Sequence, residues 1–129
     1  MKKILIIEDE ETIRNELKTL LENSGYEVLM LEKFTNAKED IKSMTLDLIL
    51  LDINLPNING EMLLKEIRKE SNIPVIMVTS RVCEVDEVLS MSYGADDYIT
   101  KPYNPTILLL RIQNIFKRIR KTKARRLSK

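Results

Sequence analysis

Five side chains of the types that carry out phosphoryl transfer stand at the ends of short apolar segments. They are, in chain order, Glu8, Asp9, Asp52, Thr79 and Lys101. Neighbouring carboxylates repel one another unless a cation lies between them, and their hard oxygen atoms favour Mg²⁺. A carboxylate can also be the nucleophile that forms an aspartyl phosphate, while an ammonium group and a hydroxyl stabilise the phosphate oxygens. The residue types therefore predict Mg²⁺-dependent phosphoryl transfer if the five groups meet.

Each of these residues also has a plain structural explanation when it is taken alone. An acid that follows a strand often caps the next helix, which would account for Glu8 and Asp9. A hydroxyl such as that of Thr79 or Ser80 can cap in the same way, and a single Lys101 is most often a solvated surface charge. The joint pattern is more specific, because the groups are distributed over the ends of four different predicted strands.

The segments that must position these groups alternate between strands and helices. Apolar, β-rich runs predict five strands, at residues 3–7, 26–31, 47–52, 74–79 and 97–100. Apolar residues at helical spacing predict five helices, at residues 10–24, 35–43, 61–70, 84–93 and 105–120. Residues 55–60 are dense in turn formers. Five strand–helix units in a row predict an α/β fold, with a parallel sheet and helices on both faces. In such sheets ligands bind beyond the carboxyl ends of the strands, where all five groups would lie.

The composition fits a single domain in a reducing compartment. A chain of 129 residues can bury a sufficient core without a disulfide, and the one cysteine, Cys83, cannot form an internal bridge. No apolar run approaches the roughly 20 residues that span a bilayer, and no signal peptide is recognisable, so we expect a cytoplasmic protein without a membrane partner. The sequence has no histidine, which excludes Ser-His-Asp catalysis and any zinc site that needs imidazole.

Four segments resemble the signature segments of response-regulator receiver domains. They are ILIIEDE at 4–10, DLILLD at 47–52, VTS at 78–80 and GADDYITKP at 94–102. The last segment is particularly similar to the OmpR/PhoB-type subfamily, and the resemblance covers nearly the whole chain. It implies a (βα)5 flavodoxin-like fold with the strand order 2-1-3-4-5.

The resemblance implies a magnesium site built on the acids. Asp52 would be the phosphoacceptor and also a ligand of Mg²⁺. Asp9 would bind the metal directly, and Glu8 would act through water. The backbone carbonyl of Asn54 would be the third protein ligand.

The resemblance also implies how the phosphoryl group is bound and sensed. Thr79 and Lys101 would contact it, and Tyr98 would be the aromatic residue that turns inward when Thr79 moves. Lys101–Pro102 would be a cis peptide, a geometry that is essentially restricted to bonds before proline. The chain would accept its phosphoryl group from a sensor histidine kinase. It would be a switch rather than an enzyme, although it would assist its own phosphorylation and dephosphorylation.

Receivers of the resembled subfamily, once phosphorylated, pair symmetrically through the fourth helix, fifth strand and fifth helix. Asp96, Asp97 and Arg111 match the charged positions that hold this face together. Glu87 stands where a base is expected, and Ile107 stands where its acidic partner is expected. One ion pair is therefore missing without a charge clash. Because such a surface pair contributes about 0–1 kcal/mol, we expect a homodimer on the same face with weaker affinity.

The charge of the chain is divided between an acidic body and a basic tail. Residues 1–116 contain 13 Lys and Arg against 20 Asp and Glu, whereas residues 117–129 contain eight Lys and Arg and no acid. By the resemblance, residues 1–118 would be the receiver, and residues 119–129 would begin a linker to a DNA-binding domain that controls transcription. The alternative is a stand-alone receiver whose tail is solvated or contacts anionic partners.

Three other functions are compatible with parts of the pattern. A phosphatase of the haloacid-dehalogenase type needs an Asp-x-Asp pair on the first strand, whereas Asp52 and Asn54 follow the third, and Asn54 cannot transfer a proton. A dinucleotide-binding domain needs a glycine-rich turn after the first strand, where this chain has three acids at 8–10. A receiver that signals without phosphorylation usually lacks part of the phosphate site, and this chain has all of it.

Overall fold

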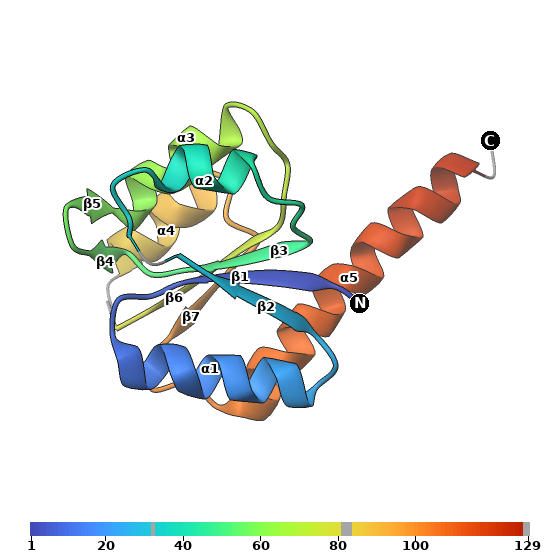
Figure 1. The fold of residues 1–129 in the computed structure, drawn as a ribbon. Coiled ribbons are helices and arrows are strands. Elements are labelled where there is room, and N and C mark those ends of the chain that lie inside the picture. Colours follow the sequence, from blue (N-terminus) through green and yellow to red (C-terminus); the bar gives the residue numbers. More distant parts are fainter. Residues whose placement is uncertain (32, 81–83, 128–129) are drawn as a thin grey trace.

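Five parallel strands form one sheet, in the order β2-β1-β3-β6-β7 (Figure 1). The strands are β1 (Lys3–Ile7), β2 (Glu27–Met30), β3 (Leu48–Leu51), β6 (Val75–Thr79) and β7 (Asp97–Thr100). The computed structural model describes residues 1–31, 33–80 and 84–127, with side chains through residue 120, so Cys83 lies outside the described residues. The predicted parallel sheet and its strand order are confirmed.

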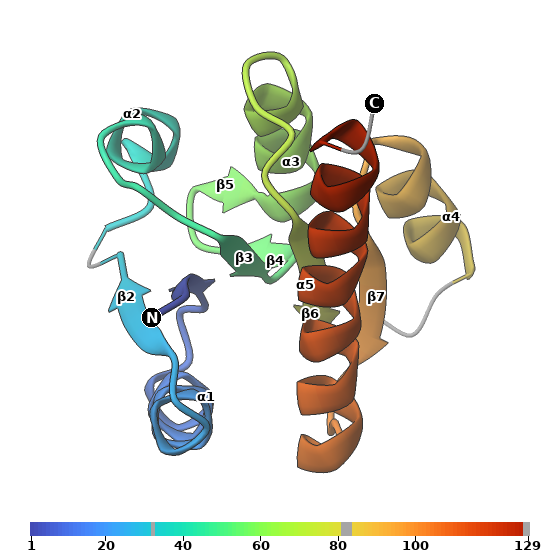
Figure 2. The same cartoon turned by 90° about the vertical axis from the view of Figure 1, so that its right-hand side faces the viewer.

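Helices cover both faces of the sheet, as the strand–helix alternation predicted. They are α1 (Glu11–Asn23), α2 (Ala37–Lys42), α3 (Gly60–Arg68), α4 (Glu84–Ser92) and α5 (Pro105–Leu127). In Figures 1 and 2, α1 and α5 lie on one face and α2, α3 and α4 on the other. Each face has its own apolar cluster, so the central strands β1, β3 and β6 are buried on both sides. This burial is why their sequences are apolar throughout instead of alternating. None of the helices within the described residues is both long and apolar enough to cross a membrane.

The turn-rich segment between β3 and α3 is more ordered than the sequence predicted. It forms a two-stranded antiparallel hairpin of β4 (Asn54–Leu55) and β5 (Ile58–Asn59). Asn57 lies at its tip with a φ of 64°, in the left-handed region that asparagine tolerates better than most residues. We predicted only a turn here, because two-residue strands are too short to give an alternating pattern.

The last helix also differs from its prediction. It was expected to end near residue 120, but α5 continues to Leu127. The reason lies in the sequence after Pro105, which contains no further Gly or Pro and is rich in Lys, Arg and Leu, all good helix formers. Cations near the carboxyl end of a helix also interact favourably with its dipole.

The start of α3 packs directly against the end of β3. The Asn59 side-chain oxygen accepts hydrogen bonds from the N–H groups of Glu61 (2.8 Å) and Met62 (3.2 Å), which caps the helix. The Gly60 N–H donates to the Ile53 carbonyl at 2.8 Å. A Cβ atom on Gly60 would lie 1.9 Å from the backbone carbonyl oxygen of Asp52. Only glycine therefore permits this approach of the helix to the strand end.

Replacing Gly60 with alanine should displace the backbone around Asp52 and lower the free energy of unfolding by about 1–3 kcal/mol, the usual cost of overpacking. Urea denaturation would measure the loss, and amide NMR shifts of Asp52 and Ile53 would report the displacement. Gly25→Ala is the control. Gly25 has a φ of 90°, but a Cβ atom added there would have no neighbour within 4 Å, so strain at this position should leave the Asp52 resonances unchanged. Unchanged Asp52 shifts in Gly60→Ala would contradict the packing argument.

Candidate functional site

Three of the predicted site residues meet directly at the carboxyl edge of the sheet. Glu8 follows β1, Asp52 follows β3 and Lys101 follows β7. The Lys101 ammonium forms an ion pair with Glu8 and a second one with Asp52, where Nζ and Oδ2 are 3.0 Å apart. The three side chains are only 10%, 4% and 6% exposed for Lys101, Glu8 and Asp52 respectively. Lys101 is therefore a buried counter-ion shared by two buried carboxylates.

Asp9 completes a cluster of three acids. Carboxylate oxygens of Glu8, Asp9 and Asp52 lie within 4.8 Å of one another. Glu8 and Asp52 are buried, whereas Asp9 is exposed and leaves one side of the cluster open to solvent. Three hard oxygen donors with an open side fit a divalent cation that keeps part of its water shell. The predicted acidic pocket is thus present as a possible metal site.

The backbone around the cluster is fixed by hydrogen bonds. Glu8 Oε2 accepts from the Glu10 N–H at 3.2 Å, and Arg14 Nη1 donates to the Glu8 backbone carbonyl at 3.1 Å. The Asp52 N–H donates to the Ile7 carbonyl at 3.1 Å, so the ends of β1 and β3 stay in register. The sequence did not single out Arg14, because an arginine in the first turns of an amphipathic helix looks like any solvated charge.

The hairpin after β3 is connected to the same carboxylate. The N–H of Asn54 donates to Asp52 Oδ1 at 3.3 Å, so this oxygen and the Lys101-bound Oδ2 have different partners. The bond orients the Asp52 side chain toward the pocket. The predicted role of the Asn54 backbone carbonyl as a metal ligand stays a prediction.

The site is short of positive charge. Burial raises the pKa of the Glu8 carboxyl above its ordinary value, although the hydrogen bonds from Lys101 and from the Glu10 N–H oppose this. Burial alone would lower the pKa of the Lys101 ammonium, but its hydrogen bonds to Glu8 and Asp52 outweigh burial and raise that pKa. Lys101 therefore holds its proton firmly, whereas burial disfavours the charged form of Glu8. A bound divalent cation would stabilise that charged form.

Thr79 and Tyr98 lie beside this site at the ends of neighbouring strands. Thr79 is fully buried, and its carbonyl accepts the Lys101 N–H at 2.8 Å. The Tyr98 ring is only 7% exposed and belongs to the apolar cluster that also contains Met77. The Lys101–Pro102 bond is cis, as predicted. The contact of Thr79 with a phosphoryl group is a prediction that the structure does not test.

Two of the five residues predicted at a dimer face form an ion pair within the chain. Arg111 Nη1 and Asp97 Oδ1 are 2.7 Å apart, and both side chains are partly exposed. Glu87 on α4 is exposed, and Ile107 on α5 is 47% exposed. These four residues are thus available at the surface.

The fifth predicted interface residue, Asp96, has a structural role of its own. Its Oδ2 accepts hydrogen bonds from Arg68 Nη2 at 3.1 Å and from the Val75 N–H at 2.9 Å. Arg68 also donates from Nε to the Gly94 carbonyl at 2.9 Å. Asp96 therefore joins α3 to the starts of β6 and β7, a role that the sequence did not reveal.

Comparisons with known proteins agree on one family. Residues 4–113 match the family model described as the response regulator receiver domain. The chain is 41% identical over 115 residues to the aerobic respiration control protein ArcA of Escherichia coli (strain K12), covering 89% of this chain and 48% of ArcA. It is 39% identical over 118 residues to the sensory transduction protein RegX3 of Mycolicibacterium smegmatis, covering 92% of this chain and 52% of RegX3. The chain thus spans about half the length of these relatives.

The fold comparison supports the same assignment. A CheY-like response regulator receiver domain protein from Methanospirillum hungatei JF-1 superposes with a TM-score of 0.87 at 34% identity, covering 95% of this chain and 98% of that one. The receiver domain of the TMAO respiratory system response regulator TorR gives a TM-score of 0.84 at 37% identity, covering 92% and 99%. The predicted flavodoxin-like α/β class is therefore confirmed.

Replacing Lys101 with methionine should leave Glu8 and Asp52 buried without their shared cation. We expect a loss of about 3 kcal/mol in the free energy of unfolding at neutral pH in the presence of a chelator. The folded variant would bind more protons than the unfolded chain, because burial raises the pKa of Glu8 and the variant lacks the Lys101 hydrogen bond that opposes this rise. Its stability should then fall as the pH increases above the ordinary carboxyl value of about 4.5.

Urea denaturation between about pH 5 and pH 8 would measure this dependence. The control is Lys69→Met, which removes an exposed partner of Glu66 and should cost at most about 1 kcal/mol. Equal stability of Lys101→Met and the parent protein at the upper pH would contradict the buried counter-ion.

Proposed function

Because the chain belongs to the response regulator receiver domain family, of the OmpR/PhoB type, we propose that Asp52 accepts a phosphoryl group from a sensor histidine kinase. The observation that supports this most directly is the ion pair of Lys101 with Asp52 inside the three-acid cluster. It brings a nucleophilic carboxylate, a cation and two further acids together at the carboxyl edge of the sheet. The proposed setting is the cytoplasm, where a lone cysteine stays reduced.

In the proposed reaction an oxygen of Asp52 forms a bond to phosphorus. The bond between phosphorus and the imidazole nitrogen of the kinase's phosphohistidine breaks at the same time, and the imidazole keeps the electron pair and takes up a proton. Such a transfer depends mainly on positioning and on neutralising oxygen charge. The Asn54 N–H at Oδ1 and the Lys101 ammonium at Oδ2 keep the carboxylate in a fixed orientation before it reacts.

The metal we propose is Mg²⁺. Asp9 and Asp52 would hold it, Glu8 would act through water, and the backbone carbonyl of Asn54 would complete the protein ligands. The ion would neutralise charge on the phosphoryl oxygens. The all-oxygen cluster with one exposed member supports this identity, because Mg²⁺ retains several of its waters in protein sites.

Lys101 would have two successive partners in this proposal. Before phosphorylation it neutralises Glu8 and Asp52 through its two ion pairs. After phosphorylation its ammonium would bind an oxygen of the phosphoryl group on Asp52, the residue that it already contacts. Thr79, whose backbone is hydrogen bonded to that of Lys101, would bind a second oxygen, and Tyr98 would turn inward as Thr79 moves, toward the interior in which it is already largely buried. By the same contacts the chain would assist both its own phosphorylation and its dephosphorylation.

We propose that the output is a symmetric dimer through α4, β7 and α5. In Figure 2, β7 lies between these two helices at one edge of the molecule. Helices α4 and α5 carry exposed apolar side chains, namely Val85, Val88, Ile107 and Leu110. The Asp97–Arg111 ion pair joins β7 to α5 and can exchange partners across a two-fold axis. Control of transcription through a DNA-binding domain, in a longer protein, would follow from dimerisation.

The acceptor assignment can be tested by intact mass after incubation with a small phosphodonor such as phosphoramidate. The parent protein should gain one phosphoryl group when Mg²⁺ is present and little when a chelator replaces it. Asp52→Asn keeps the shape of the side chain and removes the nucleophile, so it should gain none. Asp9→Ala should label at least about tenfold more slowly, because it loses a direct metal ligand.

Glu11→Gln is the matched control for these variants, since it removes one acid close to the pocket but outside the cluster. It should label at the parent rate. Labelling of Asp52→Asn at that rate would show that another residue is the acceptor.

The dimer can be tested by analytical ultracentrifugation with beryllofluoride bound as a phosphoryl mimic. Arg111→Glu should shift the activated protein toward monomer, because it places two acids together in place of the Asp97–Arg111 pair. Dimerisation of the parent should depend only weakly on salt, since the apolar Ile107 contributes in place of an ion pair. Lys69→Glu, at the C-cap of α3, is a charge-matched control and should dimerise normally. An activated parent that stays monomeric would contradict this face.

A further inference from the structure

The carboxyl-terminal part of α5 extends beyond the body of the molecule. In Figure 1 it continues away from the sheet, on the side of the molecule where the amino terminus lies. The family match ends at residue 113, whereas the helix continues to Leu127. Residues 117–127 of this helix include seven Lys and Arg and no acid. A structured element with this charge is a feature that the proposed phosphoryl transfer does not use.

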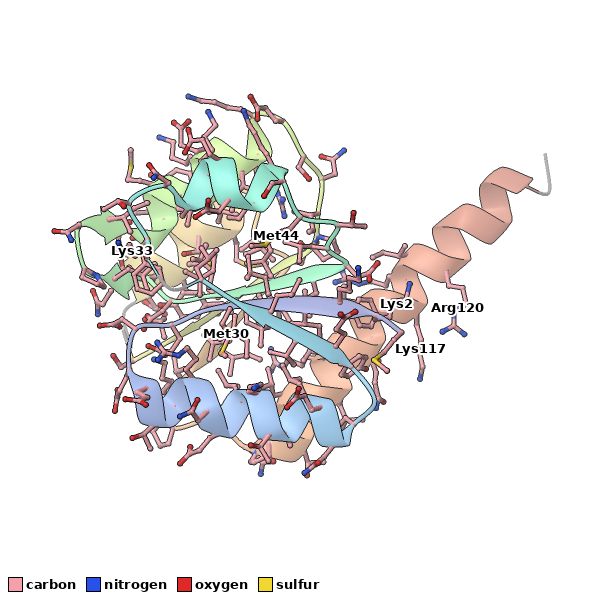
Figure 3. The ribbon with its side chains drawn as sticks, in the orientation of Figure 1. Lys2, Met30, Lys33, Met44, Lys117 and Arg120 are labelled. Carbon is pink, nitrogen blue, oxygen red and sulfur yellow. The ribbon has the colours of Figure 1, made fainter. Side chains whose placement is uncertain are left out.

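Cations from a distant part of the sequence add to this element. Lys2 directly precedes β1, and its Nζ is 5.4 Å from the centroid of the Phe116 ring on α5. Lys117 and Arg120 are exposed, and their spacing of three residues places them on neighbouring positions of one helix side. Figure 3 shows Lys2, Lys117 and Arg120 at the end of the molecule where the helix leaves the body.

We propose that a basic surface, defined as Lys2, Lys117 and Arg120 and continued along α5 by the helical residues 121–127, binds the phosphate backbone of duplex DNA without reading its sequence. This binding does not depend on Asp52. It is a property of the receiver chain itself and not of a further DNA-binding domain.

Charge density is the main argument for duplex DNA. Eleven helical residues extend over roughly 16 Å, so the seven cations of 117–127 are spaced about one per 2 Å along the axis. Duplex DNA carries about one negative charge per 1.7 Å of its own axis. A helix that lies along the duplex can therefore neutralise several phosphates at once and release their condensed counter-ions.

The acidic cluster of the candidate site is not a partner for this basic surface. Glu8, Asp9 and Asp52 follow the carboxyl ends of parallel strands, whereas the helix leaves the body beside the amino end of β1. The two charged regions therefore lie at opposite edges of the sheet. The acidic cluster cannot fold back onto the basic surface within one molecule.

A membrane surface is also a poorer match than DNA. Helices that insert into the interface of a bilayer combine cations with a broad apolar face rich in Leu, Phe or Trp. Residues 117–127 contain only two large apolar residues, Ile119 and Leu127, and no aromatic residue. Phosphate contacts along a duplex need charge and reach but no apolar anchor.

Fluorescence anisotropy with two labelled duplexes of unrelated sequence and equal length would test the proposal on the full chain. At about 50 mM KCl both duplexes should bind with affinities within roughly twofold of each other, and the affinity should fall steeply with added salt. The double variant Lys117→Gln/Arg120→Gln should weaken binding at least about tenfold and reduce the slope of log affinity against log salt by about two.

The matched control is Lys33→Gln/Lys69→Gln, which removes two exposed cations from other parts of the body and should bind like the parent. Asp52→Asn should also bind like the parent, which separates this surface from the proposed phosphorylation. Three outcomes would overturn the proposal: no binding at about 50 mM KCl, an equal loss in both double variants, or tighter binding to vesicles containing anionic phospholipid than to DNA.

Discussion

The shared counter-ion is the interaction on which the site depends. Three carboxylates within 4.8 Å of one another repel strongly, and two of them are buried where water cannot screen them. The Lys101 ammonium partly offsets this repulsion by contacting both buried acids. Its position requires β7 to end beside β6, with the Lys101 N–H bonded to the Thr79 carbonyl. The parallel sheet thus holds together charges that come from residues 8, 52 and 101.

The sequence was most informative where a single physical factor dominated. The central strands were predicted closely because burial on both faces makes them apolar throughout, and the carboxyl ends of β1 and β3 then located Glu8 and Asp52. Lys101 was located by the end of the edge strand β7. The cis peptide at Lys101–Pro102 came from family resemblance instead. The metal, the phosphoryl contacts and the dimer face are still predictions, because they depend on ions and partners that a single chain does not contain.

Other features were missed because they arise from tertiary contacts between distant residues. Asp96 has the sequence context of an interface residue, yet its Oδ2 is bound by Arg68 and the Val75 N–H, which lie 28 and 21 residues away. The role of Arg14 depends on the Glu8 carbonyl, which no helical pattern reveals. The close approach of Gly60 to Asp52 needs the hairpin between them, whose strands are too short to leave a pattern. In each case the residue type and its local sequence context were compatible with several different contacts in the folded chain.

The continuity of α5 gives the molecule a mechanical property. Its base is packed against the sheet through Leu108 and Ile112, both fully buried, while its 23 residues at about 1.5 Å each make a rod of roughly 35 Å. A rod without Gly or Pro after its first residue bends little, so it behaves as a lever arm. A tilt of a few degrees at the packed base becomes a displacement of an ångström or more at the far end. Small changes of side-chain packing beside the sheet are thereby amplified geometrically at residue 127.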